Sequence, residues 1–214
     1  MAEAWDAIAP GYASRAAVFT GSFGAELLAA ACLGAGCTVL DVAAGSGTVA
    51  LQAAITPGVA AVHACDLSPG MIEELTASAL QLPAAAAEIE CTVCDATALP
   101  MADDGFYAVV SNFGVIFAPD VAAGLAEMAR VCRPGGRVAF TTWGRTPAFT
   151  AIEDAWRATL QDTAPAAPAP PDASAVVVAR ITQQLLDVGG LTDISVIAVE
   201  HELVVAHVCG NDEF

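Results

Sequence analysis

The sequence predicts an α/β fold, in which helices cover both faces of a doubly wound, mostly parallel sheet. Short apolar runs typical of buried parallel strands alternate with helix-compatible segments between residues 37 and 143. An aspartate also ends each of the first three predicted strands, namely Asp41, Asp66 and Asp95. Because the carboxyl ends of parallel strands border one crevice, we expect these three carboxylates to share a site.

The first predicted strand and the loop after it organise the rest of the chain. Residues 38–40 form the apolar strand, Asp41 ends it, and a helix-compatible run begins at Thr48. The loop between them consists of small residues, 43–47. A glycine loop that leads from a strand into a helix brings backbone N–H groups and the positive end of the helix close to a ligand.

Two cofactors compete for this loop. The pattern Gly45-x-Gly47-x-x-Ala50 satisfies the loose fingerprint of Rossmann-type dinucleotide sites. A dinucleotide, however, would place its pyrophosphate near the carboxylate of Asp41, which repels it. S-adenosylmethionine carries an ammonium and a sulfonium, which the same carboxylate attracts. Electrostatics therefore favours S-adenosylmethionine, and a strand–turn–helix without any ligand is the plain structural alternative.

Two further units repeat the pattern of strand and acid. The second strand, 59–64, leads to Asp66, and Ser68 and Pro69 suit the N-cap and first position of the next helix. Asp66 stands about one βαβ repeat beyond the first strand, where a carboxylate accepts hydrogen bonds from the hydroxyls of a ribose. The third strand, 88–94, leads to Asp95. Together these acids support an adenosine ligand without identifying the cofactor.

Residues 1–214 are expected to form one Rossmann-like domain with four parts. These are N-terminal helices over the cofactor end, a cofactor-binding core, a variable substrate cover with an Ala/Pro linker, and a C-terminal helix and strand. Their ranges are 1–36, 37–143, 144–172 and 173–214. Helices are predicted at 5–12 (broken at Pro10-Gly11), 22–33, 48–54, from Pro69, and at 120–132, 147–163 and 173–188. The remaining strands are predicted at 106–110, 137–143 and 194–208.

Composition restricts the partners. The net charge is −17, and all seven basic residues are arginine. A chain so poor in cations does not neutralise a phosphate backbone, so nucleic acid is not expected as a partner, and anionic membrane surfaces are disfavoured. The apolar runs are interrupted before they reach membrane-spanning length, and acids rather than bases stand near Met1. We therefore expect a cytoplasmic protein without membrane insertion.

The cysteines do not predict a metal site. Of the seven, only Cys91 and Cys94 form a close pair, and residues three apart on a strand point to opposite faces. No metal is therefore expected, and the thiols are interpreted as small buried side chains.

Five motifs occur in the order and spacing of one enzyme family: V-L-D-V-A-A-G-S-G (39–47), C-D-L-S-P-G-M (65–71), C-D-A-T-A-L-P (94–100), S-N-F-G-V-I-F-A-P-D (111–120) and R-V-C-R-P-G-G-R-V (130–138). With them, the chain resembles the class I S-adenosylmethionine-dependent methyltransferases. Within that class it is similar to the small-molecule group typified by the ubiquinone and menaquinone biosynthesis methyltransferases. The resemblance implies S-adenosyl-L-methionine as cofactor, S-adenosyl-L-homocysteine as product, and a small-molecule acceptor.

The resemblance also implies roles for individual residues. The methionine part of the cofactor would lie against Tyr12, Asp41, Ala43, Gly45, Ser46 and Gly47. Asp66 would bind the ribose hydroxyls, and the adenine would lie against Leu67, Met71, Asp95 and Ala96. Asn112 and Phe113 would lie under the sulfonium.

The chain departs from the family pattern in several places. The first glycine of the loop is Ala43, and the N-terminal signature of the quinone methyltransferases is absent, which argues against a quinone acceptor. No N-P-P-Y follows the fourth strand, so methylation of amino groups on nucleic acid bases is not implied. The family sheet has seven strands and six can be counted, so the last strand is expected to be missing, with a truncated chain as the favoured explanation.

The catalytic residues stay unknown at this stage. His63, His201 and His207 lie within predicted strands and are poorly placed for a general base. Three functions remain open: a methyltransferase acting on oxygen or carbon of a small molecule, an idle S-adenosylmethionine-binding scaffold, and an NAD-dependent oxidoreductase. A monomer or a homodimer is compatible with each of them.

Overall fold

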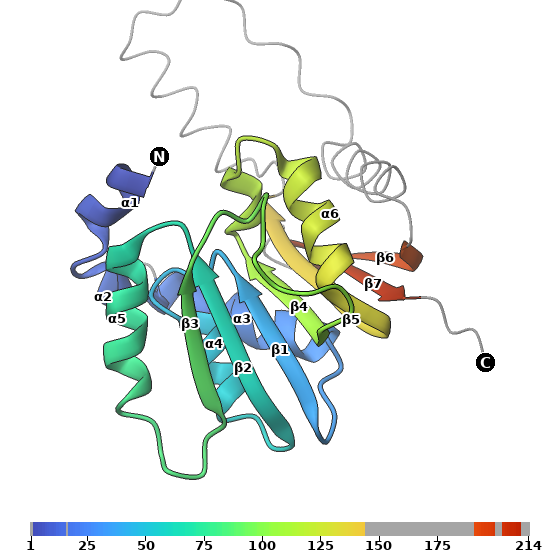
Figure 1. The fold of residues 1–214 in the computed structure, drawn as a ribbon, viewed down its shortest axis with the longest axis horizontal. Coiled ribbons are helices and arrows are strands. Elements are labelled where there is room, and N and C mark those ends of the chain that lie inside the picture. Colours follow the sequence, from blue (N-terminus) through green and yellow to red (C-terminus); the bar gives the residue numbers. More distant parts are fainter. Residues whose placement is uncertain (1, 16, 144–190, 200–202, 211–214) are drawn as a thin grey trace, which may run out of the picture.

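The computed structural model describes residues 2–15, 17–143, 191–199 and 203–210. They form a seven-stranded sheet in the order β3-β2-β1-β4-β5-β7-β6 (Figure 1). The strands are β1 (Cys37–Val42), β2 (Val59–Asp66), β3 (Glu88–Val93), β4 (Phe106–Asn112), β5 (Cys132–Trp143), β6 (Leu191–Val199) and β7 (Leu203–Gly210). Strands β1 to β5 pair in parallel, and β7 pairs antiparallel with both β5 and β6. The predicted doubly wound, mostly parallel sheet is confirmed.

Helices cover both faces of this sheet (Figure 1). They are α1 (Ala2–Ile8), α2 (Tyr12–Arg15), α3 (Ala17–Ala30), α4 (Thr48–Ala54), α5 (Pro69–Ala79) and α6 (Val121–Val131), with a 3₁₀ turn at Val115–Phe117. Alternate residues of β1 pack on opposite sides: Val39 joins the core under α3 and α4, and Leu40 joins the core under α6. Burial on both faces explains why these strands are continuous apolar runs.

Local signals placed several helices correctly. The side chain of Ser68 accepts a hydrogen bond from the N–H of Met71 at 3.1 Å, and Pro69 opens α5. Asp120 likewise accepts from the N–H of Ala123 at 3.0 Å and caps α6. These caps satisfy N–H groups that have no partner inside the helix.

The boundaries of α3 and β5 differ from the prediction. Helix α3 spans Ala17–Ala30 rather than 22–33. It packs closely on α4, since a Cβ on Gly24 would lie 3.1 Å from Cγ2 of Val49. Strand β5 begins at Cys132 rather than at residue 137. Its register on β4 shifts between the pair Phe106–Cys132 and the pair Ala108–Arg137, so residues 133–136 form an irregularity in the strand.

The prediction of a missing last strand is wrong. The segment 194–208, predicted as one long strand, is divided between β6 and β7, which pair antiparallel with Val199 opposite Leu203. The polar residues 200–202 separate two apolar halves, and each half pairs with a neighbour instead of extending as one strand. The predicted helices at 147–163 and 173–188, with the linker at 164–172, lie outside the described residues.

Within the part of the chain that the structure describes, no helix combines the length and the apolar character needed to cross a membrane.

Candidate functional site

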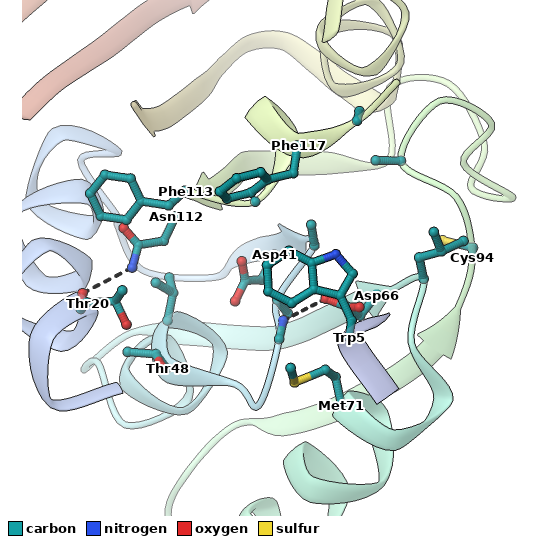
Figure 2. A pocket seen from close by; sticks show the side chains of 18 of the residues that line it. Trp5, Thr20, Asp41, Thr48, Asp66, Met71, Cys94, Asn112, Phe113 and Phe117 are labelled. Carbon is teal, nitrogen blue, oxygen red and sulfur yellow. Dashed lines mark hydrogen bonds between the residues drawn. The ribbon is translucent and has the colours of Figure 1, made fainter. Parts of the chain in front are cut away.

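A cavity of about 360 Å³ lies at the carboxyl ends of β1, β2 and β4. It lies beside the point where the strand order reverses between β1 and β4, which is where open α/β sheets bind ligands. Figure 2 shows the carboxylates of Asp41 and Asp66 in this cavity, with Phe117 above them and Met71 below. Trp5, from α1, lies in front of them.

The loop between β1 and α4 has an unusual backbone. Ala43, Gly45 and Gly47 all have positive φ, of 54°, 56° and 92°. At Gly47 a side chain is excluded by contact as well, because a Cβ would lie 1.9 Å from Cδ1 of the buried Leu75. Ala43 adopts the left-handed conformation at a steric cost that glycine would not have. The loop geometry therefore needs glycine most strictly at Gly47.

Asp41 is the most deeply buried acid that the structure describes, with 1% of its surface exposed. Its Oδ2 accepts a hydrogen bond of 2.9 Å from the N–H of Ala50 in the first turn of α4. Its Oδ1 is buried at the cavity without a hydrogen-bond partner among the described residues. Burial raises the pKa of Asp41 to about 8, against the opposing effect of the Ala50 N–H. A cation placed at Oδ1 would favour the ionised form.

Asp66 connects the glycine loop to the start of α5. Its Oδ2 accepts the N–H of Gly45 at 2.8 Å, and its Oδ1 accepts the N–H of Ser68 at 2.9 Å. Burial raises the pKa of Asp66, and these backbone hydrogen bonds oppose the shift. Each carboxylate oxygen can accept a second hydrogen bond, so Asp66 can still bind two hydroxyl groups of a ligand.

Asp95 has a different environment, because it is exposed at the mouth of the cavity. Its Oδ1 accepts hydrogen bonds of 2.8 Å from both the N–H and the hydroxyl of Thr97. This turn fixes the loop after β3 and leaves the other carboxylate oxygen available to a ligand.

The end of β4 is held by a short network of hydrogen bonds. The amide of Asn112 donates to the backbone carbonyl of Thr20 at 3.1 Å and accepts from the hydroxyl of Thr141 at 2.8 Å. The same hydroxyl accepts the N–H of Phe113 at 2.8 Å. Phe113 is buried with a positive φ of 56°, so the cavity wall is fixed at this residue. Thr20 contributes through its backbone, which no sequence pattern indicated.

Helix α1 lies across the cavity and is attached at two points. Asp6 accepts hydrogen bonds from the hydroxyl of Ser68 and from the N–H of Gly70, at the start of α5. Trp5 meets Phe117 edge to face with ring centroids 5.5 Å apart, and meets Tyr12 at 6.3 Å. An aromatic cover over the carboxylates is the result.

The described lining of the cavity holds three acids, Asp41, Asp66 and Asp95, and no arginine, lysine or histidine. The described residues also contain no group of three or more His, Cys, Asp or Glu side chains that could hold a metal ion. The chemistry of this site is therefore that of carboxylates, aromatic rings and backbone N–H groups.

Comparison with known proteins agrees with this geometry. A family model described as a methyltransferase domain matches residues 39–136. The crystal structure of magnesium protoporphyrin IX methyltransferase from Synechocystis, which contains bound S-adenosylhomocysteine, has the same fold with a TM-score of 0.63. The two are 18% identical, and the match covers 91% of this chain and 83% of the other.

Residues 39–136 thus match a methyltransferase domain, and the chain has the Rossmann-like fold of the S-adenosylmethionine-dependent methyltransferases.

Two curated relatives extend the comparison. An uncharacterized protein of Mycobacterium tuberculosis is 43% identical over 132 residues, which cover 62% of this chain and 46% of the relative. A ubiquinone/menaquinone biosynthesis C-methyltransferase of Geotalea daltonii is 38% identical over 112 residues, or 52% of this chain and 47% of the relative. The matches thus span about half the length of these relatives.

Most residues that the methyltransferase resemblance implied line the cavity: Tyr12, Asp41, Ala43, Gly45, Asp66, Leu67, Met71, Asp95, Ala96, Asn112 and Phe113. Ser46 and Gly47 do not line it. Ser46 is buried behind the loop, and Gly47 packs on Leu75 at the start of α4. Their place in the motif reflects the shape of the loop.

The cavity also has lining residues to which sequence reasoning gave no role: Thr20, Ala44, Thr48, Val49, Cys94, Gly114, Phe117, Ala118 and Pro119. Several of them belong to the motif at 111–120, so position within that motif was the available signal. Trp5 belongs to the N-terminal helices that were expected over the cofactor end, and it lines the cavity.

Proposed function

We propose that this chain binds S-adenosylmethionine in the cavity and transfers its methyl group to an oxygen or carbon atom of a small-molecule acceptor. The observation that carries the proposal is the buried Oδ1 of Asp41, which has no hydrogen-bond partner among the described residues although Asp41 lines the cavity. A buried polar atom of this kind needs a partner, and the ammonium of the methionine group is a matching one.

The other acids fit the remainder of the same ligand. Asp66 has lone pairs available for two ribose hydroxyls, and Met71 and Leu67 offer apolar surface on the adjoining wall for a base. Asp95 at the mouth could accept a hydrogen bond from an exocyclic amino group. These residues follow three successive strands, in the order that an extended nucleoside would require.

The bound cofactor would supply an electrophilic methyl group that is already activated by the sulfonium. The protein then needs chiefly to orient the acceptor and to exclude water. Asn112 and Phe113 are fixed by the hydrogen bonds of Thr141, and the aromatic cover of Trp5 and Phe117 shields the carboxylates. We assign no general base.

A small acceptor is supported by the charge of the chain. The net charge of −17 and the absence of lysine oppose binding of nucleic acid, and the described lining adds three further acids. The aromatic side chains of Trp5, Phe113 and Phe117 favour an acceptor with an apolar or aromatic part.

The structure gives a new reason to prefer a methyl donor over NAD. Charge repulsion alone is weak at neutral pH, because burial keeps Asp41 mostly protonated. However, Oδ2 of Asp41 already occupies the N–H of Ala50, which a pyrophosphate at this helix would need. The idle scaffold remains the second candidate, since the described lining holds no histidine or lysine that could act as a base.

Calorimetric titration of the full chain with S-adenosylmethionine, S-adenosylhomocysteine and NAD tests the proposal. We expect both methionine nucleosides to bind and NAD not to bind. Asp41→Asn, which keeps the size of the side chain, should weaken binding at least about tenfold, the effect usual for a lost charged hydrogen bond. Asp104→Asn makes the same change at an exposed residue outside the lining and should leave binding unchanged.

Binding of NAD alone would refute the proposal. Binding of the nucleosides without methylation of any acceptor in a library of small phenols, enols and acids would favour the scaffold instead.

A further inference from the structure

We propose that Cys65 and Cys94 form an oxidisable thiol pair at the wall of the cavity, and that a disulfide between them weakens cofactor binding. The first half of this inference concerns the thiols alone. The second half rests on the proposed function.

The sheet brings the two cysteines together although they are 29 positions apart in sequence. Strands β2 and β3 are adjacent and parallel, with Cys65 opposite Thr92, and Cys94 follows two residues later on the same side. The N–H of Cys94 donates to the carbonyl of Asp66 at 3.0 Å, which continues the pairing past the end of β3. The two thiols are close enough to shift each other's pKa, and both side chains pack on the core under α6.

The neighbouring Cys91 is not part of this pair. It packs against the other core, under α3 and α4, on the opposite face of the sheet. Cys91 and Cys94 thus point to opposite faces of the sheet, as predicted, and no sequence pattern indicated that Cys94 has a partner on another strand.

The environment gives the two thiols different roles. Cys94 lines the cavity and is partly exposed, so a small oxidant can reach it, and Cys65 is buried. The interaction between the two thiols lowers the pKa of Cys94 and raises the pKa of Cys65 well above its usual range, and burial also raises the pKa of Cys65. Cys94 is therefore the sulfur that reacts first, because the thiolate is the nucleophile.

A peroxide supplies the oxidising equivalents. The thiolate of Cys94 attacks one peroxide oxygen, an S–O bond forms, the O–O bond breaks, and hydroxide (or an alkoxide) leaves. The sulfur of Cys65 then attacks the sulfur of Cys94, the S–S bond forms, and the S–O bond breaks. The hydroxyl leaves with the proton of Cys65 as water. Two thiols are oxidised to one disulfide as one peroxide is reduced.

The disulfide would act on residues of the cavity because both cysteines precede them directly. Asp66 follows Cys65 and Asp95 follows Cys94, and the carbonyl of Cys65 accepts the N–H of Ala44 in the glycine loop at 2.9 Å. A covalent S–S bond is much shorter than a non-bonded contact between two sulfur atoms, so its formation draws the two strand ends together. That movement shifts Asp66 and Asp95 relative to the glycine loop. The cavity then loses the shape that it has in the protein with reduced thiols.

The sequence offers a direct test. Cleavage before aspartate releases Cys65 in the peptide 41–65, where it is the only cysteine, and Cys91 with Cys94 in the peptide 66–94. After treatment of the reduced full chain with hydrogen peroxide, we expect mass spectrometry to find these two peptides joined. The crosslink should persist in Cys91→Ser, the matched control on the same strand, and disappear in Cys94→Ser and in Cys65→Ala.

Affinity for S-adenosylhomocysteine is then measured by calorimetry on reduced, oxidised and re-reduced protein. We expect oxidation to weaken binding about tenfold, within the range usual for coupling between sites, and dithiothreitol to restore it. The oxidised Cys91→Ser variant should behave like the wild type, and peroxide should not change the affinity of Cys94→Ser.

Absence of the crosslink, or its loss in Cys91→Ser, would overturn the thiol pair. A crosslink with unchanged affinity would overturn the regulatory half. If the reduced protein binds no methionine nucleoside while the crosslink still forms, the proposed function fails and the thiol pair stands.

Discussion

The raised pKa of Asp41 leads to a prediction about stability that needs no ligand. Burial moves the pKa of this carboxyl from 3.8 to about 8 in the folded chain. Between these two values the unfolded chain releases a proton that the folded chain retains, so the free energy of unfolding falls as pH rises. The stability present below pH 4 is thus lost progressively up to about pH 8, and no further loss from this group follows above that pH.

The size of the effect follows from the width of this interval. One pKa unit corresponds to about 1.4 kcal/mol, so the three units between pH 5 and pH 8 correspond to about 4 kcal/mol from this one side chain. Asp41→Asn removes the titration, and its carbonyl can still accept the N–H of Ala50. From pH 5 to pH 8 the wild type should therefore lose about 4 kcal/mol more stability than the variant.

Urea unfolding of the ligand-free proteins at both pH values, followed by circular dichroism, measures this difference. Asp104→Asn controls for the loss of a carboxylate at an exposed position. Other shifted groups, such as Asp66, contribute to the wild type and the variant alike and largely cancel. If the wild type and Asp41→Asn lose the same stability within about 1 kcal/mol, Asp41 does not retain its proton, and the electrostatic argument about the site is wrong.

Three further outcomes are expected. Because Asp41 is mostly protonated at pH 7, binding of S-adenosylhomocysteine should release close to one proton. Calorimetry in two buffers with different ionisation enthalpies measures the number of protons released, and zero release would contradict the placement of the ammonium at Asp41. Gly47→Ala combines a positive φ with the collision at Leu75 and should lower the free energy of unfolding in urea by about 2–4 kcal/mol. Gly34→Ala, with open space around it, is the control, and an equal loss of stability in both variants would show that packing on Leu75 does not require glycine at residue 47. Asp6→Ala removes the hydrogen bonds to Ser68 and Gly70, so amide hydrogen exchange should become faster in residues 2–8 and stay unchanged in α6. Unchanged exchange in residues 2–8 would mean that the aromatic contacts alone hold α1.

Features set by short stretches of sequence were predicted well. The end of β1 at Val42, one residue beyond the predicted Asp41, and the end of β2 at Asp66 depend on residues within a few positions of one another. The same holds for the caps at Ser68 and Asp120. Such signals are readable without tertiary structure, because a cap or a loop satisfies backbone groups of its own segment.

Features that depend on contacts between distant segments were missed. The close packing of Gly24 in α3 on Val49 of α4 has no local signal, and the division of 194–208 depends on each half finding a partner strand. The pair of Cys65 and Cys94 requires the register of β2 on β3, which no sequence pattern supplies. The backbone contact of Thr20 in the site has the same origin, because a carbonyl can come from any residue.

The distribution of charge along the sheet has a consequence for turnover. Three arginines contact groups near the amino end of β5. Arg130 forms ion pairs with Glu127 and Asp103. Arg133 lies over the ring of Tyr107, and Arg137 donates to backbone carbonyls. The acids of the cavity lie at the opposite, carboxyl edge. Under the proposed function, methyl transfer would convert a cationic sulfonium into a neutral thioether, so the attraction between the site and the spent donor would fall at the moment of reaction. A negative site of this kind would then promote product release, and the preference for donor over product should shrink as salt is added.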